Sequence, residues 1–137
     1  MSTRAFGDIV VGDHASFETT ITEDQVLAFA KLSGDENPLH VDASYAQGTQ
    51  FGQRVVHGMY LGALVSRLVG MGLPGTKALL VRESLTFKEP TFIGDTVLVR
   101  GEVVHKTEAM QLLTIAITIT RAGQALAEGE VLAKVLP

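Results

Sequence analysis

The stretch VVHGMYLGALVSRLVG at residues 55–70 decides the fold, because it predicts a helix with apolar side chains on nearly every face. A helix of this kind has to be enclosed, either by other layers of protein or by lipid. Residues 55–73 approach the length of a membrane span, but they include His57, Arg67 and four glycines. We therefore expect a helix from Val56 to about Gly70 that is buried in the core of a globular domain.

Strand-like segments after this helix supply the enclosing layer. Ile115, Ile117 and Ile119 alternate with small or polar residues, which is the period of a half-buried strand. One buried helix followed by successive strands indicates an α+β fold, in which an antiparallel sheet of about five strands wraps round the central helix. All 137 residues are expected to form one domain. Beside the isoleucine strand, further strands are predicted at residues 14–20, 77–89, 95–106 and 124–136.

The segment ahead of the central helix reads as an overhanging connection. A capping-box pattern predicts a helix over about residues 22–33. Pro38 cannot continue that helix, so residues 35–40 are expected to form a loop. A short helical turn over residues 43–47, capped by Asp42, is expected to follow.

The composition excludes several classes of function. The net charge of −4 is spread along the chain, so the electrostatic footprint of a nucleic-acid binder is absent. Without cysteine there is no thiolate nucleophile, disulfide or cysteine zinc site. The first residues show no secretory signal pattern, so a cytoplasmic location is expected. Neither a nucleic acid nor a membrane is an expected partner.

Asp35 and His40 are the candidate catalytic pair. They lie on one short segment stiffened by Pro38, so a carboxylate and an imidazole can contact the same water molecule. A carboxylate that accepts a proton and an imidazole that orients or donates are the minimum for adding water to an activated alkene. On spacing alone, the alternative is an ordinary turn beside a surface imidazole.

A carbonyl-binding group is expected where the central helix begins. First-turn N–H groups lack intrahelical acceptors and lie at the positive end of the helix dipole, so they can stabilise an oxyanion. The N–H of Gly58 is the candidate donor, and the missing side chain lets a ligand approach closely. The alternatives are close helix–sheet packing at Gly58 and a core imidazole bonded to backbone at His57.

Three motifs follow one another along the chain: SGDENPLHVD at 33–42, VVHGMYLGALVSRLVG at 55–70 and SLTFKEPTFIGDTV at 84–97. In this order and spacing they resemble the MaoC-like hydratases, in particular the (R)-specific enoyl-CoA hydratases that feed polyhydroxyalkanoate synthesis. The pattern GD-x-NP-x-H followed by VHGM is specific for that family. The resemblance runs from roughly Phe29 to Val97 and continues weakly to the end of the chain.

The resemblance implies a hot-dog fold and a role for each matching residue. Asp35 would be the general base on water, and His40 would orient that water and assist proton transfer to the α-carbon. The N–H of Gly58 would bind the thioester oxygen. Such enzymes hydrate trans-2-enoyl-CoA to (R)-3-hydroxyacyl-CoA without a metal or redox cofactor, and they work as homodimers. The positions implied to bind substrate are Asn37, His57 and Ser66, the last of which lines the acyl pocket.

Four alternatives remain open at this stage. Two share the fold: an acyl-CoA thioesterase, and a dehydratase acting on acyl-carrier-protein substrates. A non-catalytic acyl-thioester-binding module is a third, although it would have no need of both Asp35 and His40. The fourth is a metal-dependent oxygenase, because His40, Asp42 and His57 spell a pattern of two histidines and one carboxylate.

Overall fold

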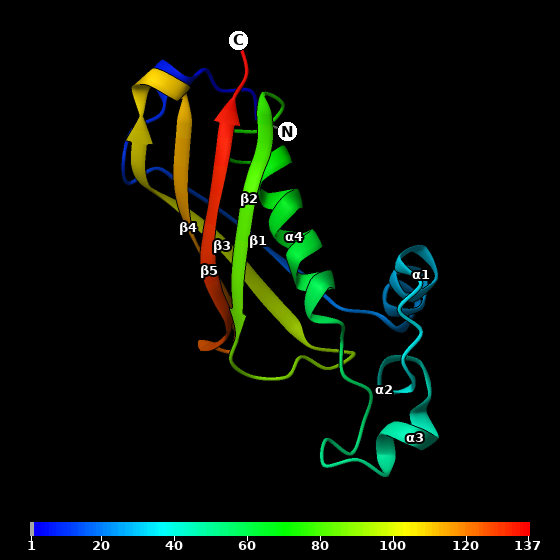
Figure 1. The fold of residues 1–137 in the computed structure, drawn as a ribbon. Helices are drawn as coiled ribbons and strands as arrows, with labels where there is room; N and C mark the ends of the chain where they lie inside the picture. Colours follow the sequence, from blue (N-terminus) through cyan, green and yellow to red (C-terminus); the bar gives the residue numbers. More distant parts are fainter. Residues whose placement is uncertain (1) are drawn as a thin grey trace.

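The computed structural model describes residues 2–137. They include a five-stranded antiparallel sheet with the strand order β1-β3-β4-β5-β2. The expected α+β arrangement and its strands are confirmed, with small shifts at the strand ends (Figure 1). Two short 3-10 helices lie at Phe6–Asp8 and Glu108–Met110. The strands are β1 His14–Thr20, β2 Ala78–Phe87, β3 Thr96–Thr107, β4 Leu112–Arg121 and β5 Gln124–Val135.

Helix α4, Gly58–Met71, lies along one face of the sheet (Figure 1). Its side chains at Leu61, Leu64, Val65 and Leu68 are buried in the same core as the isoleucines of β4. The opposite side of the helix is exposed, with Met59 67% accessible. The expectation of a helix enclosed on every face is therefore wrong for the single chain, because one sheet covers only one side of it.

The segment between α1 and α4 overhangs the sheet, as expected. Helices α1 (Glu23–Ser33), α2 (Pro38–Val41) and α3 (Ala43–Gln47) lie off the sheet, beyond the first turn of α4 (Figure 1). The predicted capping box of α1 is present, with Thr22 and Gln25 bonded reciprocally.

The prediction of a loop over residues 35–40 is wrong for its second half. Pro38 begins the short helix α2 instead of preventing one, because the first helical position needs no N–H and suits the fixed φ of proline. The Asn37 side chain caps this helix by accepting a hydrogen bond from the N–H of Leu39 at 2.9 Å. His40 is consequently held on a helical turn, and its direction is set by that turn.

A search of residues 2–137 finds no helix with both the length and the apolar character needed to cross a membrane. Helix α4 is too short for that role.

Candidate active site

Asp35 and His40 meet at the junction between α1 and α2. The carboxylate Oδ2 of Asp35 lies 3.8 Å from Nε2 of His40. This separation is too long for a direct hydrogen bond, yet it allows both atoms to contact one water molecule at ordinary hydrogen-bond distances of about 2.8 Å. The side chain of Asp35 is 53% exposed and that of His40 is 15% exposed, so the pair is open to solvent on the carboxylate side.

Backbone contacts hold both members of the pair. The N–H of Asn37 donates to Oδ1 of Asp35 at 3.3 Å, which leaves Oδ2 free to face His40. The Nδ1 of His40 lies 2.6 Å from the carbonyl oxygen of Val55, and this contact assigns the ring proton to Nδ1. In the neutral ring, Nε2 of His40 then carries the lone pair that faces Asp35. The role of the Val55 carbonyl has no signal in the sequence, because fifteen residues separate it from His40.

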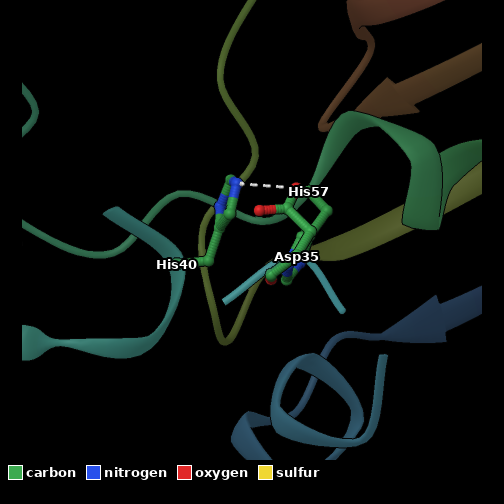
Figure 2. Close-up of side chains that lie close together, drawn as sticks. All are labelled: Asp35, His40 and His57. Atoms are coloured by element: carbon green, nitrogen blue, oxygen red, sulfur yellow. Dashed lines mark hydrogen bonds and ion pairs between the residues drawn. The ribbon is translucent and has the colours of Figure 1, made fainter. Parts of the chain in front are cut away.

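The rings of His57 and His40 pack against each other in the cluster that includes Asp35 (Figure 2). The two imidazole rings stack with centroids 3.8 Å apart, and the edge of Phe29 contacts His57 with centroids 4.9 Å apart. His57 is 2% exposed, its Nε2 donates to the carbonyl of Asp35 at 2.9 Å, and its Nδ1 has no partner. These contacts match the core-imidazole alternative, so His57 supports His40 and Asp35 and does not line the hollow that His40 lines.

Gly58 lies at the N-terminus of α4 and lines a hollow of about 390 Å³ together with His40. The ring of Phe87 packs directly on Gly58, where a Cβ would come within 2.9 Å of Cζ. The close-packing alternative for Gly58 thus has direct support. The expectation that the missing side chain leaves room for a ligand is wrong, because the Phe87 ring fills that space. This packing is compatible with the oxyanion role, since Phe87 occupies the side-chain position and not the N–H. The contact between Phe87 and Gly58 was missed from the sequence because the two residues lie on different elements.

Of the other two predicted substrate-binding residues, Asn37 contacts the pair through its backbone N–H, whereas Ser66 lies apart from it. Asn37 is exposed, and its side-chain oxygen is used to cap α2. Ser66 lies two turns further along α4, on the exposed side of that helix. The structure therefore brings together Asp35, His40 and Gly58, while Ser66 can contact only a ligand that extends along α4.

Two histidines and one carboxylate lie close together, but the carboxylate is not the one that the oxygenase alternative named. Ligand atoms of Asp35, His40 and His57 lie within 4.8 Å of one another, whereas Asp42 caps α3 through the N–H of Tyr45. The two imidazoles are inclined by only 26° and are stacked. Histidine binds a metal in the plane of its ring at about 2.1 Å, so two stacked rings cannot both direct a lone pair at one ion. The geometry fits an acid–base pair better than a metal site.

Other histidine and basic side chains lie on or beside the sheet. His14 and His105 are exposed on the sheet. Arg82 and Lys88 pair with glutamates of β5, at 3.3 Å from Glu130 and 3.6 Å from Glu128 respectively. Lys88 also lines the hollow that contains His40 and Gly58, so it is a cation at the edge of the site.

Comparison with known proteins places the chain in a family. The model of the MaoC like domain matches residues 10–123. An (R)-specific enoyl-CoA hydratase from Rhodospirillum rubrum is 42% identical over 91% of this chain and 87% of its own length. A 3-hydroxybutyryl-CoA dehydratase from Methylorubrum extorquens is 35% identical over 95% and 83%. The chain belongs to the MaoC-like domain family.

Solved structures agree with this assignment. An (R)-hydratase from A. caviae involved in PHA biosynthesis superimposes with a TM-score of 0.90, at 38% identity over 94% of this chain and 98% of that one. The fold is the hot-dog fold of these hydratases.

The contacts of His57 lead to a first prediction. In His57→Phe the stacked ring remains, but the hydrogen bond to the Asp35 carbonyl is lost and a partly buried acceptor is left unpaired. Such a loss costs about 1–3 kcal/mol. If this loss of free energy raises the barrier of the reaction, kcat falls by about 10- to 100-fold. Steady-state kinetics should show the loss in kcat more than in KM. The exposed ring in His105→Phe serves as the control, and a kcat within twofold of the control would contradict a positioning role for His57.

Proposed function

We propose that this protein is an (R)-specific enoyl-CoA hydratase, which adds water to trans-2-enoyl-CoA to give (R)-3-hydroxyacyl-CoA and catalyses the reverse dehydration. The observation that carries the proposal is the 3.8 Å separation of Asp35 Oδ2 and His40 Nε2 beside the hollow that begins at Gly58. The activities named for the R. rubrum and M. extorquens relatives are the two directions of this reaction class.

The proposed mechanism gives each group one step. The thioester oxygen accepts a hydrogen bond from the N–H of Gly58. The electron pair of the double bond can therefore move toward that oxygen when water attacks C3. Asp35 removes a proton from the attacking water. The negative charge on the thioester oxygen is stabilised by the N-terminus of α4 until the proton that Asp35 accepted passes to C2 with the assistance of His40, which returns Asp35 to the carboxylate. Water has then been added across the double bond, and the thioester remains intact.

The reaction is proposed to need no metal or redox cofactor, because Asp35, His40 and Gly58 supply the base, the proton transfer and the electrophilic stabilisation. Coenzyme A enters only as part of the substrate. Dialysis against a chelator should leave the activity unchanged, and metal analysis of protein purified without a histidine tag should find no stoichiometric iron.

Incubation with crotonyl-CoA tests the function. Hydration removes the absorbance of the enoyl thioester without releasing a thiol, and the product should be the (R) enantiomer. Release of free CoA would instead indicate the thioesterase alternative. Binding of crotonyl-CoA without any turnover would indicate the non-catalytic module. Comparison with crotonyl carrier protein decides between the hydratase and the carrier-protein dehydratase alternatives, since a carrier-specific enzyme would prefer the latter substrate.

We further propose that two chains associate along β2 to form the homodimer expected from the sequence. β2 is an edge strand of the sheet, and edge strands present unpaired backbone groups. Leu79 and Val81 on this edge are 51% and 55% exposed, and the adjacent side of α4 exposes Met59. Exposed apolar side chains on an edge strand are typical of an interface.

The proposed dimer predicts a mass change in one of two matched variants. Val81→Lys places a charge at a bulge of the β2 edge, where it should shift the solution mass toward that of one chain. Val104→Lys is the control, since Val104 is a 44% exposed valine at a bulge of β3, away from that edge. Light scattering after gel filtration measures both masses. A wild-type monomer, or a Val81→Lys variant as dimeric as the control, would remove β2 as the interface.

The cytoplasmic location and a role in polyhydroxyalkanoate synthesis remain predictions, which rest on the sequence and on the resemblance.

A further inference from the structure

The segment 90–95, between β2 and β3, runs beside the chain that leads into α4. Val55 and Phe92 form an antiparallel bridge, and the N–H of Val56 donates to the carbonyl oxygen of Thr91 at 2.7 Å. Thr91 also lines the hollow that contains His40 and Gly58. This segment therefore adjoins both the hollow and the residues from which α4 begins.

Val55 connects the segment to His40. The N–H of Val55 donates to the carbonyl oxygen of Leu39 at 3.1 Å, and its own carbonyl oxygen lies 2.6 Å from Nδ1 of His40. The same residue forms the bridge to Phe92. The position of the carbonyl oxygen that orients His40 therefore depends on where Phe92 and its neighbours lie.

Arg121, the last residue of β4, fixes segment 90–95 to the sheet. Its Nη1 donates to the carbonyl oxygen of Pro90 at 3.1 Å and to Oδ2 of Asp95 at 2.6 Å. Oδ2 of Asp95 also accepts a hydrogen bond from the N–H of Phe92 at 2.8 Å. The Arg121 and Asp95 side chains are only 26% and 20% exposed, so water weakens their charge-assisted hydrogen bond little. The ion pair thus fixes Pro90 and Phe92 together.

We propose that Arg121 and Asp95 are positioning residues for His40. This inference rests on the proposed hydratase function. The contacts are continuous from the ion pair to Phe92, from Phe92 to Val55, and from the Val55 carbonyl to Nδ1 of His40. They fix the direction of the imidazole, and a misplacement of about 1 Å in a reacting group can cost about 100-fold in rate.

Backbone hydrogen bonds keep segment 90–95 attached to the sheet without the Arg121 side chain. The N–H of Gly94 donates to the carbonyl oxygen of Ile21 at 2.7 Å, and the N–H of Ile21 donates to the carbonyl oxygen of Asp95 at 2.9 Å. Both bonds hold the end of the segment that leads into β3. Loss of the Arg121 side chain is therefore expected to release the other end, which bridges to the chain before α4, and to leave the sheet intact.

The kinetic test is Arg121→Gln, which removes the charge and shortens the side chain. With crotonyl-CoA, kcat should fall about 10- to 100-fold while KM changes much less, because a reacting group is misplaced. Arg121→Lys keeps the charge but lacks the planar guanidinium, so it should recover part of the loss. Arg100→Gln is the control, since Arg100 pairs with Glu102 at 3.2 Å on β3 and is 40% exposed. A kcat of Arg121→Gln equal to that of the control would overturn the inference.

Combination with His40→Gln separates the positioning of His40 from a general effect on structure. Residues in one hydrogen-bond network are coupled, so Arg121→Gln should cost nothing further in kcat once the imidazole is absent. If Arg121→Gln instead lowers kcat by the same factor in the His40→Gln background as in the wild type, Arg121 does not act through His40 and the inference is wrong.

The hydrogen bond of His40 supplies a readout that needs no turnover. The proton on Nδ1 should give a slowly exchanging signal in NMR spectra of nitrogen-labelled protein, identified by its absence in His40→Gln. It should persist in Arg100→Gln and exchange with water at least about tenfold faster in Arg121→Gln, because the Val55 carbonyl is then less firmly held. Equal exchange in the two arginine variants, or no such signal in the wild type, would overturn the inference.

The NMR measurement also keeps the inference separate from the proposed function. If the wild type does not hydrate crotonyl-CoA, the proposed function fails, and the exchange of the His40 proton alone decides whether Arg121 and Asp95 position the ring. Thermal unfolding of each variant checks the fold, and Arg121→Lys serves alone if the glutamine variant does not fold.

Discussion

Asp35→Asn is expected to lower kcat for crotonyl-CoA by about 10²- to 10⁴-fold, the range for loss of a positioned general base. An amide cannot accept the proton of the attacking water. The shape of the site should be unchanged, since the N–H of Asn37 can still donate to the remaining side-chain oxygen at position 35. KM should therefore change much less than kcat, which is the pattern for an interaction made only in the transition state.

Stability provides the check on this variant. The Asp35 side chain is 53% exposed and makes no buried ion pair, so the unfolding midpoint of Asp35→Asn should match that of the wild type. Glu36→Gln is the matched control, because it neutralises the next carboxylate in the chain, which is also exposed. If Asp35→Asn retains activity near that of Glu36→Gln, Asp35 is not the base and the proposed mechanism is wrong.

His40→Gln should give a loss of similar size, about 10²- to 10⁴-fold in kcat. The substitution removes the lone pair of Nε2 that faces Asp35, together with the ring that stacks on His57. A glutamine can still donate to the carbonyl of Val55, so the short helix α2 should keep its place. His14→Gln, at an exposed position on β1, is the control for loss of an imidazole.

The double variant tests whether the two groups act on one water molecule. Residues that act as a unit lose activity non-additively, so Asp35→Asn combined with His40→Gln should be little worse than the poorer single variant. A product of the two separate losses would show that Asp35 and His40 serve independent steps, and it would contradict the shared-water arrangement.

Local patterns in the chain were sufficient for most of the fold. The capping box at Thr22, the β1 strand and the alternating isoleucines of β4 each depend on residues within a few positions of one another, and the structure confirms them. The segment that contains Asp35 and His40 was also recognisable, because its polar residues and Pro38 are contiguous. The expectation at Pro38 failed in detail because proline both ends one helix and suits the first position of the next.

Contacts between distant segments could not be read in the same way. The stack of His57 on His40 and the ring of Phe87 on Gly58 each join residues from different elements. Their distances follow from how α4 packs on the sheet and where the overhanging segment lies. No periodicity within one element encodes that packing.

The exposed side of α4 shows most clearly the difference between what local sequence patterns determine and what tertiary packing decides. The apolar pattern of residues 55–70 correctly placed a helix against a sheet, because burial of apolar surface is favourable whatever the partner. The pattern could not say that one chain covers only one side of that helix, since the coverage depends on the shape and size of the whole sheet. The amino-acid order thus specified the elements and the reacting groups, whereas tertiary packing decided which groups meet, which contacts hold them and which apolar surface stays open.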